Sequence, residues 1–140
     1  DEGLKLNLPL VCANPDKVVI RKDGNLIVCA GVLADYYESH GGKVFYFGKP
    51  HKEVYKKCLA YLSEVKPAIS SKNVLVIGDS LETDILGANK AEIKSLLIAD
   101  GIHSKQLYNS NHSNLSLKNL TTLSKKFSAF PDYLIKSFIF

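Results

Sequence analysis

The fold is decided by the stretch Val-Leu-Val-Ile-Gly-Asp-Ser-Leu-Glu-Thr-Asp at residues 74–84. Its four leading aliphatic residues predict a short strand that is buried on both faces, as in a parallel sheet. Gly78 ends this strand, and Asp79 stands at its carboxyl end. Parallel α/β sheets bind their ligands at this edge, so Asp79 is a candidate functional residue.

Asp84 is the second acidic residue of the stretch, and it falls in the opening of a helix predicted over about residues 83–91. Its carboxylate and that of Asp79 are expected near one point. Oxygen ligands at such an edge suit Mg²⁺, which binds one or two carboxylates together with water and substrate phosphate. The alternative is that Asp79 only caps the helix, and this stretch alone leaves both interpretations open. Ser80 and Thr83 are further candidates for capping.

Size and composition restrict the class of protein. The 140 residues suffice for one compact domain, and a hydrophobic fraction of 46% is typical of a globular protein. The net charge is +4, and the eighteen basic residues are scattered, so we expect no nucleic-acid partner. We expect no membrane partner and a cytoplasmic location, because the sequence shows neither a long apolar run nor a signal peptide.

The three cysteines, Cys12, Cys29 and Cys58, are odd in number and lack the spacing of metal ligands. Each has apolar neighbours, which predicts buried free thiols and a reducing compartment.

The first part of the chain predicts short elements separated by turns. Asn14-Pro15-Asp16 is a strong turn pattern, and Lys22 to Asn25 form a polar hairpin turn. Gly41-Gly42 is typical of a helix end. The predicted elements are the end of a helix in residues 1–8, strands over 9–13 and 17–20, and a helix over 30–40.

The second part predicts strands that alternate with helices. The order is a strand over 43–47, a helix from Pro50 to about Val65, the strand over 74–77, the helix over 83–91 and a strand over 95–99. This order favours a parallel sheet with right-handed crossovers. Beyond it we expect a polar loop with a weak helix, in which His103 and His112 are surface residues. A short amphipathic helix within 115–127 and an edge strand over 131–135 complete the chain.

Lys49 follows the strand over 43–47 as Asp79 follows the strand over 74–77. Neighbouring parallel strands lie about 4.8 Å apart, so these two side chains are predicted to share one site. A lysine there can hold a phosphate oxygen or stabilise a nucleophilic carboxylate. A metal-bound carboxylate there serves phosphoryl chemistry. The sequence has neither a glycine-rich nucleotide cradle nor a Gly-x-Ser-x-Gly motif.

Three stretches carry a resemblance to a known family. They are Cys12-Ala13-Asn14-Pro15-Asp16, then Gly48-Lys49-Pro50, then Gly78-Asp79 with Asp84 and Ile85. In this order they resemble the haloacid dehalogenase (HAD) superfamily, and within it the class IIA branch of NagD-like and p-nitrophenyl-phosphatase-like proteins. The resemblance runs from about residue 9 to 102.

The resemblance implies an α/β fold: residues 1–43 as the latter part of a cap domain, and residues 44–140 as the second half of a Rossmann-like HAD core with a parallel sheet. It implies an Mg²⁺-dependent phosphatase that acts on a small phosphorylated metabolite through an aspartyl-phosphate. Lys49 would stabilise the nucleophile and the phosphoryl group, and Asp79 and Asp84 would be the metal-site acids. Asn14 and Asp16 would face the substrate from the cap.

The sequence departs from the family because no two aspartates stand two residues apart as in the nucleophile motif Asp-x-Asp. The family's Thr/Ser motif is expected before residue 1 as well. Without a nucleophile the covalent route is closed. We therefore expect the carboxyl-terminal portion of a longer phosphatase, inactive alone, with either a complementing amino-terminal portion or a second copy of itself along an open sheet edge. Two alternatives stay open: a non-catalytic interaction or ligand-binding module derived from a HAD hydrolase, and an unrelated α/β domain. The sequence does not specify the substrate.

Overall fold

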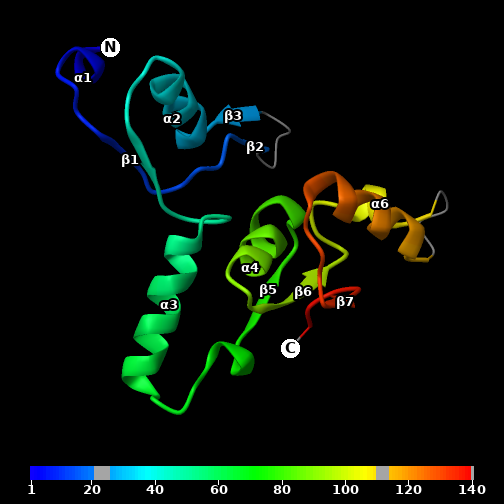
Figure 1. Ribbon diagram of the computed structural model, residues 1–140. Helices are drawn as coiled ribbons and strands as arrows, with labels where there is room; N and C mark the ends of the chain where they lie inside the picture. The colour runs from blue at the N-terminus through cyan, green and yellow to red at the C-terminus, as the bar shows by residue number, and fades with distance from the viewer. Residues whose placement is uncertain (21–25, 110–113, 140) are drawn as a thin grey trace. The chain divides into compact units, whose positions relative to one another are not determined.

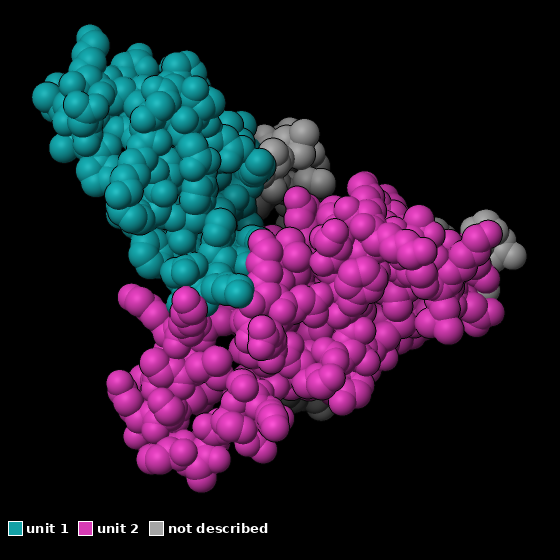
Figure 2. Space-filling view, in the orientation of Figure 1, with its two compact units in different colours: residues 1–54 teal, residues 55–140 magenta. Residues whose placement is uncertain are grey.

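The computed structural model of the chain describes residues 1–20, 26–109 and 114–139. It divides into two units, residues 1–54 and residues 55–140, which Figure 2 colours teal and magenta. The strands of each unit pair only within that unit in the described parts of the chain, so each unit is described by itself.

The first unit is built on a parallel pair of strands, β1 (Leu10–Cys12) and β4 (Val44–Tyr46), after a short helix α1 (Glu2–Lys5). Cys12 is in register with Tyr46, and the amide of Phe47 extends the pairing by donating to the carbonyl of Cys12 at 2.7 Å. The predicted strand over 43–47 is thus present. Its hydrogen-bonding partner in the described chain is β1, and its expected place beside the strand over 74–77, which belongs to the other unit, stays a prediction.

An antiparallel pair and a helix complete the first unit. Strands β2 (Val18–Ile20) and β3 (Leu26–Val28) pair as the predicted hairpin, whose turn at residues 22–25 lies outside the described residues. Helix α2 (Ala30–Ser39) follows, and Ala34 on its inner face is fully buried. Gly41 has φ +84°, a left-handed conformation that glycine adopts without steric cost, which confirms the predicted helix end.

Helix α3 (Lys52–Val65) carries the boundary between the units (Figure 1). It begins two residues after Pro50, so this proline lies in the preceding turn and not in the helix itself. The buried residue of α3 is Tyr55, whereas Cys58 is exposed. All three cysteines are free, as predicted. Burial was predicted for each of them and holds only for Cys12, since Cys29 is half-buried.

The second unit is a three-stranded parallel sheet in the order β5-β6-β7 (Figure 1). This arrangement confirms the predicted parallel α/β fold, with β7 as an edge strand. In chain order the elements are η1 (Ser71–Asn73), β5 (Leu75–Gly78), the π-helical turn η2 (Leu81–Ile85), α4 (Leu86–Lys90), β6 (Lys94–Ile98), α5 (Ser104–Leu107), α6 (Leu117–Phe127) and β7 (Tyr133–Ile135).

The core of the second unit lies on one face of this sheet. Leu97 of β6 is fully buried against Leu81 and Ile85 of η2, and Leu107 of α5 joins them. Residues two apart on a strand share a face. Leu75 and Ile77 occupy the opposite face of β5, and each is 42% exposed. The prediction that this strand is buried on both faces is therefore wrong.

Two further sequence expectations concern this unit. His103 was expected at the surface, but it is only 6% exposed, so that expectation is wrong. His112 lies outside the described residues. In the part of the chain that the structure describes, no helix is both long enough and apolar enough to cross a bilayer.

Candidate functional site

Asp79 stands at the carboxyl end of β5 and is half-buried. Its Oδ2 accepts a hydrogen bond of 3.1 Å from the backbone amide of Ile102, just beyond β6. Gly101 makes this approach possible, because a Cβ atom at position 101 would lie 2.1 Å from the Cβ of Asp79. The neighbouring strand therefore fixes the direction of the Asp79 carboxylate.

The helix cap in this stretch is Ser80. Its Oγ accepts from the amide of Thr83 at 3.2 Å, and its carbonyl accepts from the amides of Asp84 and Ile85 at 3.0 Å each. Within the described residues, the side-chain hydrogen bond of Asp79 goes to Ile102 and not to the helix. The capping interpretation of Asp79 is therefore wrong, and its role in a metal site stays a prediction.

Asp84 is 5% exposed, and its carboxylate faces the turn that carries Asp79. Its Oδ2 accepts from the amide of Ser80 at 3.1 Å. Gly78 leaves the space for it, because a Cβ atom at position 78 would lie 2.2 Å from the Cγ of Asp84. Asp84 therefore closes the Gly78–Asp84 turn from within, and Asp79 is the more accessible of the two carboxylates.

Two residues that the sequence did not single out hold this turn from outside. Tyr55 of α3 donates from its hydroxyl to the backbone carbonyl of Asp84 at 3.3 Å. Burial, reinforced by the nearby Asp84, raises the pKa of this tyrosine to about 12. His103 accepts the amide of Leu81 at its Nε2, at 3.1 Å. The position of His103 just after β6, at the same sheet edge as Asp79, is the sequence feature that would have revealed it.

In the first unit, the two predicted segments meet at the carboxyl ends of β1 and β4. Gly48 has φ +95°, and a Cβ atom there would lie 3.0 Å from the carbonyl oxygen of Ala13. The exposed Lys49 therefore follows a backbone turn that packs on the segment carrying Asn14. Asn14 in turn accepts the amide of Asp16 at its Oδ1, at 3.3 Å.

This Asn14–Asp16 turn is also held by the start of α2. The amide of Gly31 donates to the carbonyl of Asp16 at 2.9 Å. A Cβ atom at position 31 would lie 2.2 Å from the carbonyl oxygen of Pro15, so only glycine permits this approach. The structure therefore brings the segment of Asn14 and Asp16 together with that of Lys49.

The remaining predicted pairing is that of Lys49 with Asp79. Lys49 belongs to the first unit and Asp79 to the second, so a shared site for the two stays a prediction. Asp79 and Asp84 do lie in one turn. No group of three or more histidine, cysteine, aspartate or glutamate side chains suited to a metal ion occurs among the described residues. A half-buried aspartate at a sheet edge nevertheless fits Mg²⁺, which takes few protein ligands and completes its shell with water and phosphate.

Comparison with known proteins decides the family. The model of the HAD-hydrolase-like family matches residues 46–123, more than half of the chain. The chain belongs to this family. The match covers β5, the Asp79 turn and β6, and it confirms the resemblance inferred from the three sequence motifs.

Relatives of this HAD-hydrolase-like chain include phosphatases of the NagD type. The ribonucleotide monophosphatase NagD of Escherichia coli K12 is 29% identical over 94 residues, which are 67% of this chain and 34% of NagD. The chain thus spans about a third of the length of this curated relative.

Solved structures extend the similarity to nearly the whole chain. A haloacid dehalogenase-like hydrolase from Brucella suis 1330 is 30% identical, with a TM-score of 0.69, over 99% of this chain and 47% of that one. A glycerol phosphate phosphatase from Mycobacterium tuberculosis, solved in complex with magnesium, shares the fold with a TM-score of 0.64 at 22% identity. That similarity covers 97% of this chain and 36% of the phosphatase.

Proposed function

We propose that this HAD-hydrolase-like chain contributes the magnesium-binding half of an active site that hydrolyses phosphate monoesters of small metabolites. The observation that carries the proposal is the Asp79 carboxylate, held at the carboxyl end of β5 by the amide of Ile102 at 3.1 Å. The relative NagD is named as a phosphatase, and one structural neighbour was solved with magnesium, which supports the assignment of this chemistry.

Each candidate residue has a role in this proposal. Asp79 would hold Mg²⁺, and the ion would neutralise charge on the phosphoryl oxygens. Asp84 accepts a hydrogen bond from the Ser80 amide and so keeps the turn closed. In this way the buried Asp84 would stabilise the metal site from behind Asp79. Lys49 binds a phosphoryl oxygen and orients the nucleophilic carboxylate. Asn14 and Asp16 contact the leaving group of the substrate.

The nucleophile must come from polypeptide outside these 140 residues, because no Asp-x-Asp occurs in them. We therefore propose that the chain alone is inactive and needs a complementing segment that carries this motif. In this scheme residues 1–43 belong to a cap and residues 44–140 to the catalytic core. The three free thiols suit the reducing environment of the cytoplasm.

Two measurements on the 140-residue chain test this proposal. Calorimetric titration with Mg²⁺ is expected to show one site. D79N should abolish this site, and D35N, at a half-exposed acid of the first unit, should leave it intact. Hydrolysis of p-nitrophenyl phosphate by the chain is expected to be undetectable. Turnover that D79N abolishes would mean that a nucleophile is present within these residues, and it would contradict the proposal.

The intact mass and gene context of the native product test the origin of the nucleophile. A strand bearing Asp-x-Asp in the native product, or in a second polypeptide that restores turnover when mixed with the chain, is the expected result. If neither exists, the chain is instead a non-catalytic interaction or ligand-binding module derived from a HAD hydrolase.

A further inference from the structure

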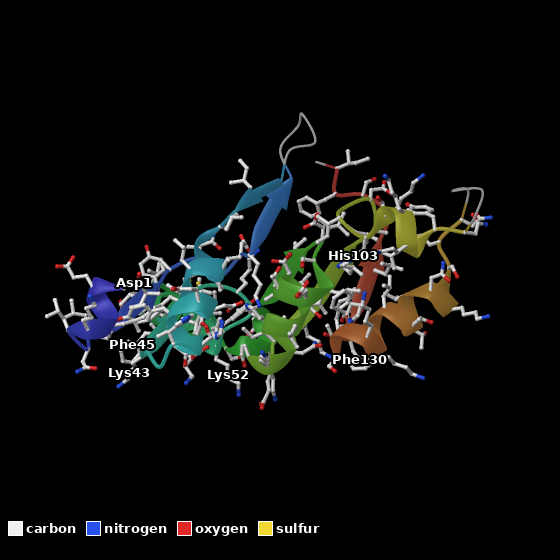
Figure 3. The ribbon with its side chains drawn as sticks, turned by 90° about the horizontal axis from the view of Figure 1, so that it is seen from above. Asp1, Lys43, Phe45, Lys52, His103 and Phe130 are labelled. Carbon is white, nitrogen blue, oxygen red and sulfur yellow. The ribbon has the colours of Figure 1, made fainter. Side chains whose placement is uncertain are left out.

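We propose that His103 is a positioning residue for Asp79: its neutral imidazole fixes the amide of Leu81 and thereby the turn that directs the Asp79 carboxylate. The inference rests on the proposed function, because it assigns His103 a role in magnesium binding. His103 lies inside the second unit and is labelled in Figure 3.

The hydrogen bonds of His103 determine which ring nitrogen carries the proton. The amide of Leu81 can only donate, so the Nε2 atom that it contacts at 3.1 Å must be an unprotonated acceptor. Nδ1 then carries the proton and donates to Oε1 of Gln106 at 3.1 Å. Phe127 packs on the ring, with the ring centres 5.4 Å apart. Both ring nitrogens are therefore hydrogen-bonded, and His103 is only 6% exposed.

Leu81 is where this contact acts on the turn. The first amides of a helical segment have no partner within it, and other groups must satisfy them. The amide of Thr83 bonds to Ser80, whereas that of Leu81 bonds to His103, twenty-two residues away. Leu81 itself is fully buried, so no water replaces a lost imidazole without cost.

The same short segment also holds Asp79 directly. Ile102 donates its amide to Oδ2 of Asp79, and Gly101 lies against the Cβ of Asp79. His103, the next residue, fixes the backbone two residues beyond Asp79. Gly101 and Ile102 thus contact the side chain of Asp79, and His103 contacts the backbone of the turn that follows it. Loss of the imidazole would remove the contact between this segment and the backbone of the Asp79 turn, and it would leave the Ile102 amide as the hydrogen bond from the segment to Asp79.

Three substitutions separate the acceptor role of His103 from its packing. In H103Q the amide oxygen stands four bonds from Cα, as Nε2 does, and it can accept the Leu81 amide. In H103N the oxygen stands three bonds from Cα, as Nδ1 does, and it falls short. H103F keeps an aromatic ring beside Phe127 but has no acceptor. H40F, at an exposed histidine of the first unit, is the matched control.

The first measurement is the dissociation constant of the chain for Mg²⁺, with no other ligand present. The amide NMR spectrum of the full chain checks that each variant is folded. H103F and H103N are expected to weaken binding by roughly 10-fold to 100-fold, the range seen when residues that orient metal ligands are replaced. H103Q is expected to stay within about threefold of the wild type, as is H40F. Equal weakening in H103Q and H103F, or none in either, would overturn the proposal.

The second measurement does not depend on the metal. Hydrogen exchange of the Leu81 amide is expected to be slow in the wild type and in H103Q, and markedly faster in H103F and H103N. If the wild type binds no Mg²⁺ while this exchange pattern holds, the proposed metal site fails but the positioning of the turn by His103 stands. Equal protection of Leu81 in all variants would refute the positioning role.

Discussion

The hydroxyl of Tyr55 donates a hydrogen bond of 3.3 Å to the backbone carbonyl of Asp84, across twenty-nine residues of sequence. The same hydroxyl lies over Gly87, where a Cβ atom would stand 2.2 Å from it. The first turns of α3 are thereby joined to the turn that carries the candidate metal-site acids. Tyr55 and both partners of its hydroxyl belong to the second unit, so this contact is internal to that unit.

Y55F is therefore expected to lower the free energy of unfolding by about 1 kcal/mol, the usual net value of a neutral hydrogen bond. Urea denaturation at pH 7 measures this loss. Y61F, on the exposed side of the same helix, is the matched control and should be neutral. An unchanged stability of Y55F would mean that the hydroxyl bond contributes nothing and that the contact of Tyr55 is only one of packing.

The raised pKa of Tyr55 predicts a dependence on alkaline pH. Because the folded pKa, about 12, lies above the ordinary value of 10.0, the folded state favours the neutral phenol. This contribution is complete below pH 10 and is lost as the pH rises toward 12. The difference in unfolding free energy between wild type and Y55F should therefore shrink over this range. A difference that stays constant up to pH 12 would contradict the shift.

Gly101 and Gly78 are expected to be intolerant of a side chain. G101A places a methyl group on the Cβ of Asp79, and G78A places one on the carboxyl group of Asp84. Each is expected to cost about 1–3 kcal/mol of unfolding free energy, typical of overpacking, and to weaken Mg²⁺ binding. G41A is the control for Mg²⁺ binding. A side chain at position 41 meets open space, and only the φ of +84° makes this substitution unfavourable. Magnesium binding that is unchanged in folded G101A would contradict the close packing at Asp79.

The sequence predicted most elements of the fold because their patterns are local. The strand and Gly78-Asp79 motif over 74–79, the helix over 30–40 and the last edge strand over 131–135 all follow from apolar runs and turn residues. The partner of β4 could not be predicted in this way. A strand of three residues carries no mark of which neighbour it joins, so its pairing with β1 was not predicted.

The candidate site was predicted in part for the same reason. Asp79 and Asp84 follow from a motif within one turn, and so does the capping role of Ser80. His103 and Tyr55 act from 22 and 29 residues away, and their partners are backbone groups, which leave no trace in side-chain spacing. The exposure of Leu75 and Ile77 was missed because an apolar run does not show whether both faces of its strand are covered.

This open face of β5 predicts binding of a hydrophobic dye. Leu75 and Ile77 lie on it, each 42% exposed, and β5 is an edge of its sheet within the described residues. We expect the folded chain to enhance the fluorescence of anilinonaphthalene sulfonate, and the double variant L75T/I77T to reduce that enhancement at least by about half. V32T, which changes an exposed residue of α2 in the first unit, is the control. Equal fluorescence in all three proteins would exclude this face as the binding surface.

Asp132 predicts a dependence on acid pH at the opposite, amino-terminal edge of the sheet. A hydrogen bond from Lys94, followed by one from the amide of Ser95 at 2.9 Å, lowers the pKa of this carboxyl below its ordinary value of 3.8. A lowered folded pKa adds stability that is present above the unfolded value and disappears as the pH falls through the folded one. The wild type should therefore lose this contribution below about pH 4.

D132A isolates that contribution. It removes the acceptor of the fully buried Ser95 amide, so we expect a loss of about 1–3 kcal/mol of unfolding free energy at pH 7. The deficit should narrow as the wild-type carboxyl becomes protonated, and urea denaturation between pH 2 and pH 7 follows it. D35N, which breaks the exposed pair of Asp35 with Lys17, is the control and should cost no more than about 0.5 kcal/mol at pH 7. If the loss of unfolding free energy in D132A were the same at pH 2 as at pH 7, Asp132 would stabilise the amino-terminal end of β6 by packing and not through its ionised carboxylate.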